Sequence, residues 1–174
     1  MKKHTLILTF ILLSTSLFAL DIKLTSMEAA FTQTVTNDKN NTLLYSGYMY
    51  AKEPYKTFWH YKKPFEKSLY ISGDKITIVQ PDLEQAIVKT LDENINILAI
   101  LRSAQKMKNG HYLARYNENR YEIVLEKKMI KSIHYKTPFD HQVVITFTDP
   151  KVNQVIDNQI FKAQIPDDFD IISE

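Results

Sequence analysis

Apolar and polar residues alternate through much of the chain, beginning with the stretch "MEAAFTQTV". Met27, Ala29, Phe31 and Val35 alternate there with polar residues. A period of two places the apolar side chains on one face of an extended segment, which predicts a β-strand. A helix through Ala30, Phe31 and Val35 is the competing interpretation.

Short strands are predicted along most of the remaining sequence. The turn signals "NDKNN", Pro54, Pro64, "SGD" and Pro81 separate them, and their spacing suits antiparallel hairpins. The further predicted strands cover residues 43–52, 56–61, 67–71, 75–80, 84–91, 112–116, 121–126, 130–135, 143–148 and 159–163. The pattern thus predicts a mainly β protein with about ten to eleven strands.

One segment, "DENINILAILRSAQKMKNG", has helical periodicity. Ile97, Leu98, Leu101 and Ala104 fall on one helical face, and Gly110 can end the helix. Acidic residues at its start and basic residues toward its end suit the helix dipole: Asp92, Glu93, Arg102, Lys106 and Lys108. A series of hairpins interrupted by one apolar-faced helix predicts a curved sheet whose concave side the helix covers.

The N-terminus has the pattern of a secretory signal peptide. "MKKHTLILTFILLSTSLFA" has a basic start, an apolar stretch over residues 6–13 and small residues after it. That stretch is shorter than the roughly 20 residues a membrane-spanning helix needs. We expect removal of residues 1–19, with cleavage after Ala19 or after Ser16, leaving one soluble domain over residues 20–174.

Charge and cysteine content exclude several classes of protein. Without Lys2 and Lys3, the 22 Lys and Arg residues fall to 20, which equals the 20 Asp and Glu residues. A near-neutral mature chain argues against nucleic acid as a partner. The absence of cysteine removes disulfides, thiolate chemistry and the lipid-modified cysteine of a bacterial lipoprotein.

Motifs for catalysis and metal binding are missing. The three glycines cannot form a phosphate-binding loop, and there is no G-x-S-x-G sequence. No histidine pair of the mature chain has metal-ligand spacing, so a structural or surface role is favoured for His60, His111, His134 and His141. The sequence therefore predicts no catalytic residue, no metal site and no cofactor, although a glycosidase-like carboxylate pair would be visible only in the fold.

Several motifs, taken in order, resemble one known family. They are "FTQ" at residues 31–33, Gly47, "EPYKTFWHYKKP", "ISGDKITIVQPDLEQA", "VVITFTDP", "NQIFKAQIP" and "DDFDII". Together they resemble the periplasmic outer-membrane lipoprotein carrier family LolA, over about residues 25–172. The order and spacing carry this resemblance, because no single motif is specific.

The resemblance implies an incomplete antiparallel β-barrel closed by a helical lid over an apolar concave cavity. A protein of this kind acts as a periplasmic chaperone that holds the acyl chains of lipoproteins. It implies acylated lipoproteins as cargo, a LolCDE-type inner-membrane ABC transporter as donor, and an outer-membrane receptor or the membrane itself as acceptor. We expect the chain to act as a monomer.

The expected cavity residues come from the apolar strands and from the helix. They are Phe31, Met49, Trp59, Tyr61, Leu69, Ile71, Ile76, Ile78, Leu98 and Leu101. Burial of each methylene is worth roughly 0.8 kcal/mol, so an acyl chain needs an enclosed path through water. If the helix is a lid, aspartate at Leu98 or Leu101 should reduce acyl binding more than it disturbs the sheet.

Two positions depart from the family pattern. The family's arginine before the proline of "EPYKTFWHYKKP", which helps to latch the lid, is replaced by Glu53. A carboxylate cannot donate hydrogen bonds to backbone carbonyls, so the latch must differ or be absent, and we expect an easily opened lid. Only residues 20–24 precede the first strand, so the family's first lid helix is expected to be short or missing.

Two other classes of function fit a sequence of this type. One is an enzyme, and the other is a periplasmic carrier or sensor of another lipid or hydrophobic ligand on the same fold. Mass spectrometry of material bound to the protein would separate these classes from a lipoprotein carrier.

Overall fold

The computed structural model describes residues 24–91, 97–116 and 118–173. The predicted signal peptide, the start of the mature chain, and Asp92 and Glu93 lie outside these residues. The described elements are β1 (Ser26–Thr36), β2 (Thr42–Lys52), β3 (Lys56–Lys63), β4 (Lys67–Ser72), β5 (Lys75–Gln80), η1 (Pro81–Leu83), β6 (Gln85–Thr90), α1 (Ile97–Ser103), β7 (Gln105–Lys106), β8 (Tyr112–Tyr116), β9 (Asn119–Glu126), β10 (Met129–Lys136), β11 (Gln142–Val152), η2 (Asn158–Phe161) and β12 (Asp170–Ser173).

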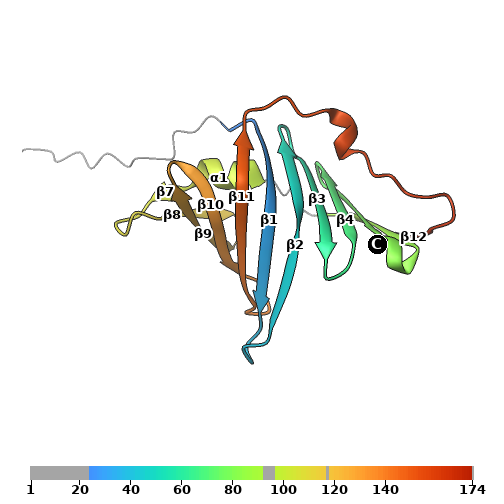
Figure 1. Ribbon diagram of the computed structural model, residues 1–174, viewed down its shortest axis with the longest axis horizontal. Helices are drawn as coiled ribbons and strands as arrows, with labels where there is room; N and C mark the ends of the chain where they lie inside the picture. The colour runs from blue at the N-terminus through green and yellow to red at the C-terminus, as the bar shows by residue number, and fades with distance from the viewer. Residues whose placement is uncertain (1–23, 92–96, 117, 174) are drawn as a thin grey trace, which may run out of the picture.

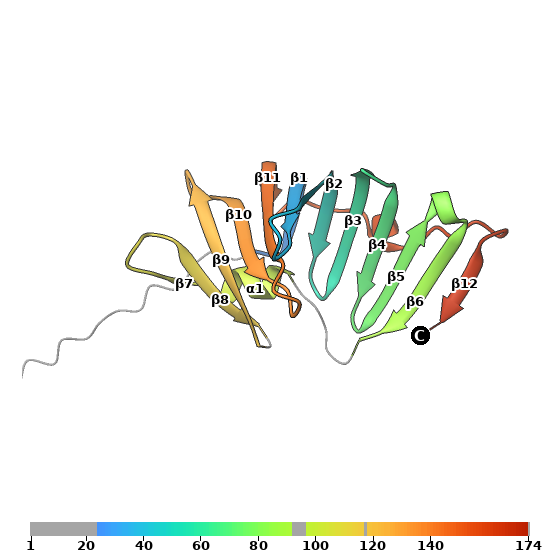
Figure 2. The same ribbon diagram turned by 90° about the horizontal axis from the view of Figure 1, so that it is seen from below.

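The strands form one curved sheet that does not close into a barrel (Figures 1 and 2). Twelve strands follow the order β12-β6-β5-β4-β3-β2-β1-β11-β10-β9-β8-β7, so β12 and β7 are its two edges. Neighbouring strands are antiparallel except β12, which runs parallel to β6. The predicted incomplete barrel is confirmed, with one strand more than the upper expectation.

β1 lies in the middle of the sheet and settles the ambiguity of the first alternating segment. It pairs with β2 along its whole length and with β11 on its other side. Phe31 therefore lies between Gly47 and Phe147. The strand interpretation of this segment is confirmed and the helical alternative is wrong.

Gly47 is needed where β2 passes β3. The pairing of these strands shifts between Ser46 and Gly47, and a Cβ atom added to Gly47 would collide with the carbonyl oxygen of His60. Any larger residue would push the two strands apart. This glycine allows the backbones to approach beside Tyr61, which pairs with it.

The C-terminal segment differs from the sequence prediction. The strand predicted over residues 159–163 is wrong: the chain forms the 3₁₀ helix η2 there, and the Asp157 side chain accepts a hydrogen bond from the Gln159 amide at 2.9 Å. Phe161 anchors this helix by being buried, and η2 lies against β3 and β4. The alternation of apolar and polar residues predicted neither of the edge strands β7 and β12, although "DDFDII", which contains the start of β12, resembles the family's final strands.

The helix is shorter than its periodicity predicts. α1 ends at Ser103, and the next residues form strand β7. Gly110 lies in the following turn with φ +87°, where its amide donates to the Met107 carbonyl at 3.1 Å. Lys106 and Lys108 are therefore not at the helix end, and only Arg102 occupies the last turn.

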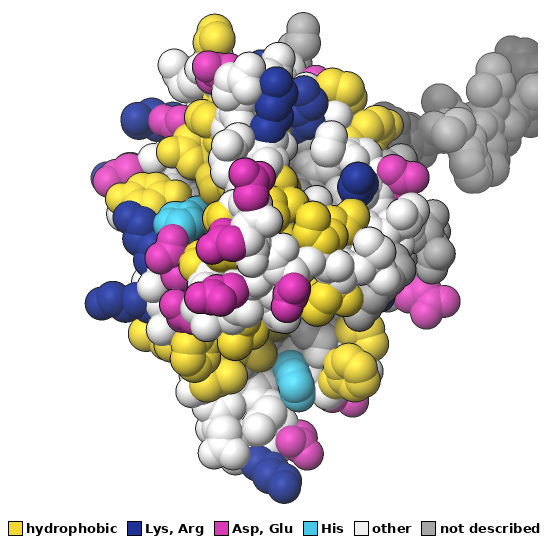
Figure 3. Space-filling model, turned by 90° about the vertical axis from the view of Figure 1, so that its right-hand side faces the viewer, with side chains coloured by type: hydrophobic (Ala, Val, Ile, Leu, Met, Phe, Trp, Pro, Cys, Tyr) yellow, Lys and Arg dark blue, Asp and Glu magenta, His cyan; other side chains and the backbone are white. Residues whose placement is uncertain are grey.

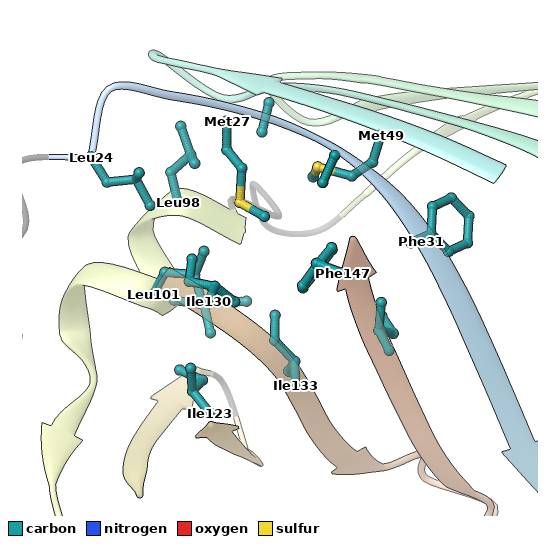
Figure 4. Packing of buried hydrophobic residues seen from close by; sticks show 14 of the residues in the cluster. Leu24, Met27, Phe31, Met49, Leu98, Leu101, Ile123, Ile130, Ile133 and Phe147 are labelled. Atoms are coloured by element: carbon teal, nitrogen blue, oxygen red, sulfur yellow. The ribbon is translucent and has the colours of Figure 1, made fainter. Parts of the chain in front are cut away.

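The core lies between α1 and one part of the concave face (Figure 4). Leu98 and Leu101 point from the helix toward Met27, Phe147 and neighbouring residues, and all of these side chains are almost completely buried. The described residues contain no helix long and apolar enough to cross a membrane.

Candidate functional site

The strand pairing places all eight of the predicted strand residues on the concave face. Met49, Trp59, Leu69 and Ile78 form one row across β2 to β5, because each pairs with the next. Paired residues of antiparallel strands project to the same face. Phe31 and Tyr61 flank this row on one side, and Ile71 and Ile76 flank it on the other.

The sheet has two arms, one formed by β2 to β6 and the other by β8 to β11, on either side of β1. A cavity of about 230 Å³ lies between α1 and these two arms. Most of its lining is apolar, and it comes from β3, β4, α1, β9, β10 and β11. The lining residues are Thr57, Trp59, Ile71, Ile97, Ile100, Tyr121, Ile133, Tyr135 and Ile145. Such a cavity can enclose hydrocarbon, but it offers few polar groups to fix a ligand's orientation.

The predicted residues occupy three different environments. Trp59 and Ile71 line the cavity. Phe31, Met49, Leu98 and Leu101 belong to the packed core instead. Tyr61, Leu69, Ile76 and Ile78 are partly buried on the concave face outside the cavity lining.

The helix presents two different faces. Leu98 and Leu101 are 0% exposed and pack in the core, whereas Ile97 and Ile100 border the cavity. The expectation that aspartate at Leu98 or Leu101 would spare the sheet is therefore revised, since a charge there would be buried without a partner. Ile97 and Ile100 are the helix positions that face the space for a ligand.

Aromatic rings surround Trp59, the only tryptophan. The ring centroid of Phe31 lies 4.9 Å from that of Trp59 and 5.1 Å from that of Tyr61, both in edge-on geometry. The Tyr61 hydroxyl donates to Gln33 Oε1 at 3.0 Å. Burial, together with the nearby Tyr135 and Tyr45, raises the pKa of Tyr61, so this hydroxyl keeps its proton to a higher pH than a solvent-exposed tyrosine does.

Glu53 connects the sheet to the helix. Its carboxylate forms an ion pair with Arg102 of α1. Arg102 Nη1 also donates to the Leu24 carbonyl at 2.9 Å, and the Glu53 amide donates to the Thr25 carbonyl at 3.0 Å. The contact between sheet and helix at residue 53 thus differs from the family's latch: the carboxylate faces an arginine supplied by the helix, and this arginine donates to a backbone carbonyl.

Sequence reasoning missed the part of the cavity that comes from the second arm of the sheet. Ile133 and Tyr135 alternate along β10, and Ile145 pairs with Ile133. This alternation was visible in the predicted strands at 130–135 and 143–148. The missing information was the pairing of β1 with β11, which brings both arms to one concave face.

Three of the four histidines in the described ranges have a polar partner for the imidazole ring. His60 Nδ1 lies 3.1 Å from Ser68 Oγ, His134 Nε2 lies 2.8 Å from Ser132 Oγ, and His111 Nδ1 lies 2.5 Å from Glu122 Oε1. No group of three or more metal-binding side chains occurs in the part of the chain that the structure describes.

The chain thus has the architecture of a curved open sheet with one helix over an apolar cavity. Solved structures share this architecture: an uncharacterized conserved protein from Thermus thermophilus (TM-score 0.53, 10% identity, 87% of this chain and 92% of that chain) and a LolA superfamily protein from Nitrosomonas europaea (TM-score 0.52, 9% identity, 82% and 92%). At these identities the likeness shows the fold alone.

The sequence comparisons show the family. Residues 22–114 match the family "Outer membrane lipoprotein carrier protein LolA". The chain is 36% identical over 170 residues to the outer-membrane lipoprotein carrier protein of Campylobacter jejuni, covering 98% of this chain and 99% of that protein. It is 31% identical over 150 residues to the protein of the same name from Wolinella succinogenes, covering 86% and 87%. The chain therefore belongs to the LolA family.

Proposed function

We propose that this protein carries acylated lipoproteins through the periplasm by enclosing their acyl chains between α1 and the concave face. The observation that carries the proposal is the cavity bordered by Trp59, Ile71, Ile97 and Ile100 in a chain of the LolA family. The family resemblance supports a LolCDE-type transporter as donor and an outer-membrane receptor or membrane as acceptor.

The size of the cavity supports a mechanism in which α1 moves. Sites for drug-sized ligands typically measure about 300–1,000 Å³, and this cavity has about 230 Å³. Part of one acyl chain would fill it, and a complete chain or further chains need the helix to swing away. Each displaced helix contact would be replaced by a contact with the acyl chain, so binding and opening are coupled.

We propose that Glu53 and Arg102 form the latch of this helix. The pair joins the β2–β3 turn to α1, and each side chain is about one-third exposed, at 37% and 34%. Partly exposed ion pairs contribute about 1 kcal/mol or less. A latch of this strength holds α1 closed and still lets a hydrocarbon ligand displace it.

The same geometry suits release to another apolar surface. Few polar groups reach the cavity, so the bound chains would be held by burial and not by directional bonds. Transfer then needs only an acceptor that buries the chains at least as well. The proposed role therefore involves no covalent step.

Cargo identity can be tested directly. The protein would be purified from the periplasm without detergent and analysed by native mass spectrometry. We expect a complex with a triacylated lipoprotein, and a variant with aspartate at Ile100 should lose it. Co-purification of a phospholipid or fatty acid alone would instead support a carrier of another lipid.

A further inference from the structure

A second pocket lies on the concave face, beside the turn between β3 and β4. It has a volume of about 320 Å³. Its lining residues are Tyr45, Phe65, Glu66, Lys67, Gln80, Asp82 and Leu83, and we refer to it as the head-group pocket. Figure 3 looks at the side of the molecule where η1 and β12 lie and shows hydrophobic surface among acidic side chains there.

The head-group pocket continues the same face as the cavity. Along β4, Lys67, Leu69 and Ile71 share one side of the strand. Lys67 lines the pocket and Ile71 lines the cavity. At about 3.3 Å per residue the two sites are about 13 Å apart along the strand, with Leu69 and its partner Ile78 between them. An apolar track thus joins them.

Lys67 is the unusual group in the head-group pocket. Its ammonium lies 4.4 Å from the ring centroid of Tyr61 and 5.2 Å from that of Tyr45. Burial lowers its pKa. No carboxylate of the described residues forms an ion pair with Lys67. The carboxylate of the neighbouring Glu66 lies 3.9 Å from His60 Nε2.

A second hydrogen-bond donor lies in the same pocket. The side-chain oxygen of Gln80 accepts from Gln85 Nε2 at 2.8 Å, which leaves the Gln80 amide nitrogen as a donor. Glu66 and Asp82 also line the pocket, so an anionic group would meet two negative charges beside one lysine. Two donors among carboxylates suit a neutral oxygen acceptor better than an anion.

We propose that the head-group pocket receives the ester or amide carbonyl oxygens at the head of an acyl chain. Lys67 and Gln80 donate to these oxygens, and the chain runs past Leu69 into the cavity beside Trp59. This inference rests on the proposed carrier function and adds the recognition of the head group. These hydrogen bonds would hold one end of the ligand in an otherwise mostly apolar site and so orient the acyl chain.

Two glycerol lipids that differ in one carbonyl test this. Monopalmitoylglycerol carries an ester, and 1-O-hexadecylglycerol carries an ether in its place. Binding is followed by the emission of Trp59, the only tryptophan. We expect the ester to bind about tenfold more tightly to the native protein, as charge-assisted hydrogen bonds require.

Lys67→Met should abolish that preference and leave ether binding unchanged. Lys62→Met is the matched control, because its ammonium also lies over a tyrosine ring, 4.7 Å from the centroid of Tyr48, but at an exposed position. Lys67→Arg should keep the preference. Thermal melts of each variant establish that all are folded.

The possible outcomes separate the two proposals. Equal affinity of the native protein for ester and ether, or equal losses for both lipids in Lys67→Met, would overturn the head-group pocket alone. Much tighter binding of palmitate than of the ester would show that the pocket selects an anion, which also overturns it. No response of Trp59 to any of these lipids would contradict the carrier proposal itself.

Discussion

The two halves of the concave face have the same alternating pattern but different surroundings. Beneath α1, Met27, Met49 and Phe147 are at most 1% exposed. Beyond the helix, Leu69, Ile76 and Ile78 project from the same face of the sheet and are only partly buried. Strand periodicity fixes which face a side chain takes, and the position of one seven-residue helix fixes whether that side chain is core or available surface.

This difference separates stability from binding within one sheet. The covered half has already removed its apolar area from water, which stabilises the fold by roughly 25 cal/mol per Å². The apolar side chains of the uncovered half are still partly in contact with water, so a ligand that covers them would gain free energy in the same way. The cavity lies at the border of the two halves, where Trp59 and Ile71 meet Ile97 and Ile100.

The largest expected effect is on stability, where α1 packs on the covered half. Leu98→Ala should lower the free energy of unfolding by about 2–5 kcal/mol, because it leaves a cavity in a fully packed site. Ile78→Ala removes a similar volume from the uncovered half and should cost less than about 1.5 kcal/mol, because this side chain is only partly buried. Urea titration followed by circular dichroism measures both, and similar losses would remove the distinction between the halves.

Binding should show the opposite order. Ile78→Asp places a charge on the apolar track and should weaken the binding of monopalmitoylglycerol by about tenfold or more, since the chain would desolvate a carboxylate. The fold should remain, because Ile78 is only partly buried. Val88→Asp, on the opposite side of the neighbouring strand β6, is the control and should bind normally. Unchanged binding by Ile78→Asp would show that the uncovered half is not used.

Much of the fold could be predicted because hairpin strands carry their own signals. β2 to β5 combine alternation with turn residues, and their predicted bounds differ from the structure by two residues or fewer. The segment of η2 has a similar alternation but no strand beside it, so its prediction as a strand was wrong. β12 depends on parallel pairing with β6, far away in the sequence, and no local pattern indicates that.

The candidate site was less predictable than the fold. Alternation was enough to assign Trp59 and Ile71 to the concave face, but the choice between core and cavity for Leu98 and Ile100 depends on a rotation of α1 by a fraction of a turn. The partner of Glu53 was also hidden. Arg102 lies 49 residues away in the sequence, and only the placement of α1 against the β2–β3 turn brings the two together.

Breaking the ion pair between Glu53 and Arg102, which joins the β2–β3 turn to α1, should have a smaller effect than the two changes described above. An arginine at position 53, where the family pattern has one, would remove the carboxylate that pairs with Arg102. Opposite Arg102 it would place two cations together, so Glu53→Arg should speed hydrogen exchange of the α1 amides about fivefold, corresponding to about 1 kcal/mol.

Charge reversal at both positions provides the decisive variant. Glu53→Arg combined with Arg102→Glu should restore slow exchange, whereas Glu28→Arg, which breaks the exposed pair of Glu28 with Lys151, should leave α1 unaffected. Unchanged exchange in the single variant Glu53→Arg would mean that this ion pair does not hold the helix.

The smallest effect concerns Tyr61, at the border of the covered and uncovered halves. Its pKa is raised by burial, so above the unfolded-state pKa of 10.0 the unfolded chain loses this proton while the folded protein keeps it. The unfolded state then binds fewer protons, and stability must fall as pH rises. From about pH 8 to about pH 10, Tyr61 should account for a loss of about 0.4 kcal/mol. Tyr61→Phe should remove this part of the pH dependence, as measured by urea titrations at both pH values. If the variant and the native protein lose the same stability, the Tyr61 hydroxyl exchanges freely with water, and the border between the halves is wetter than its packing indicates.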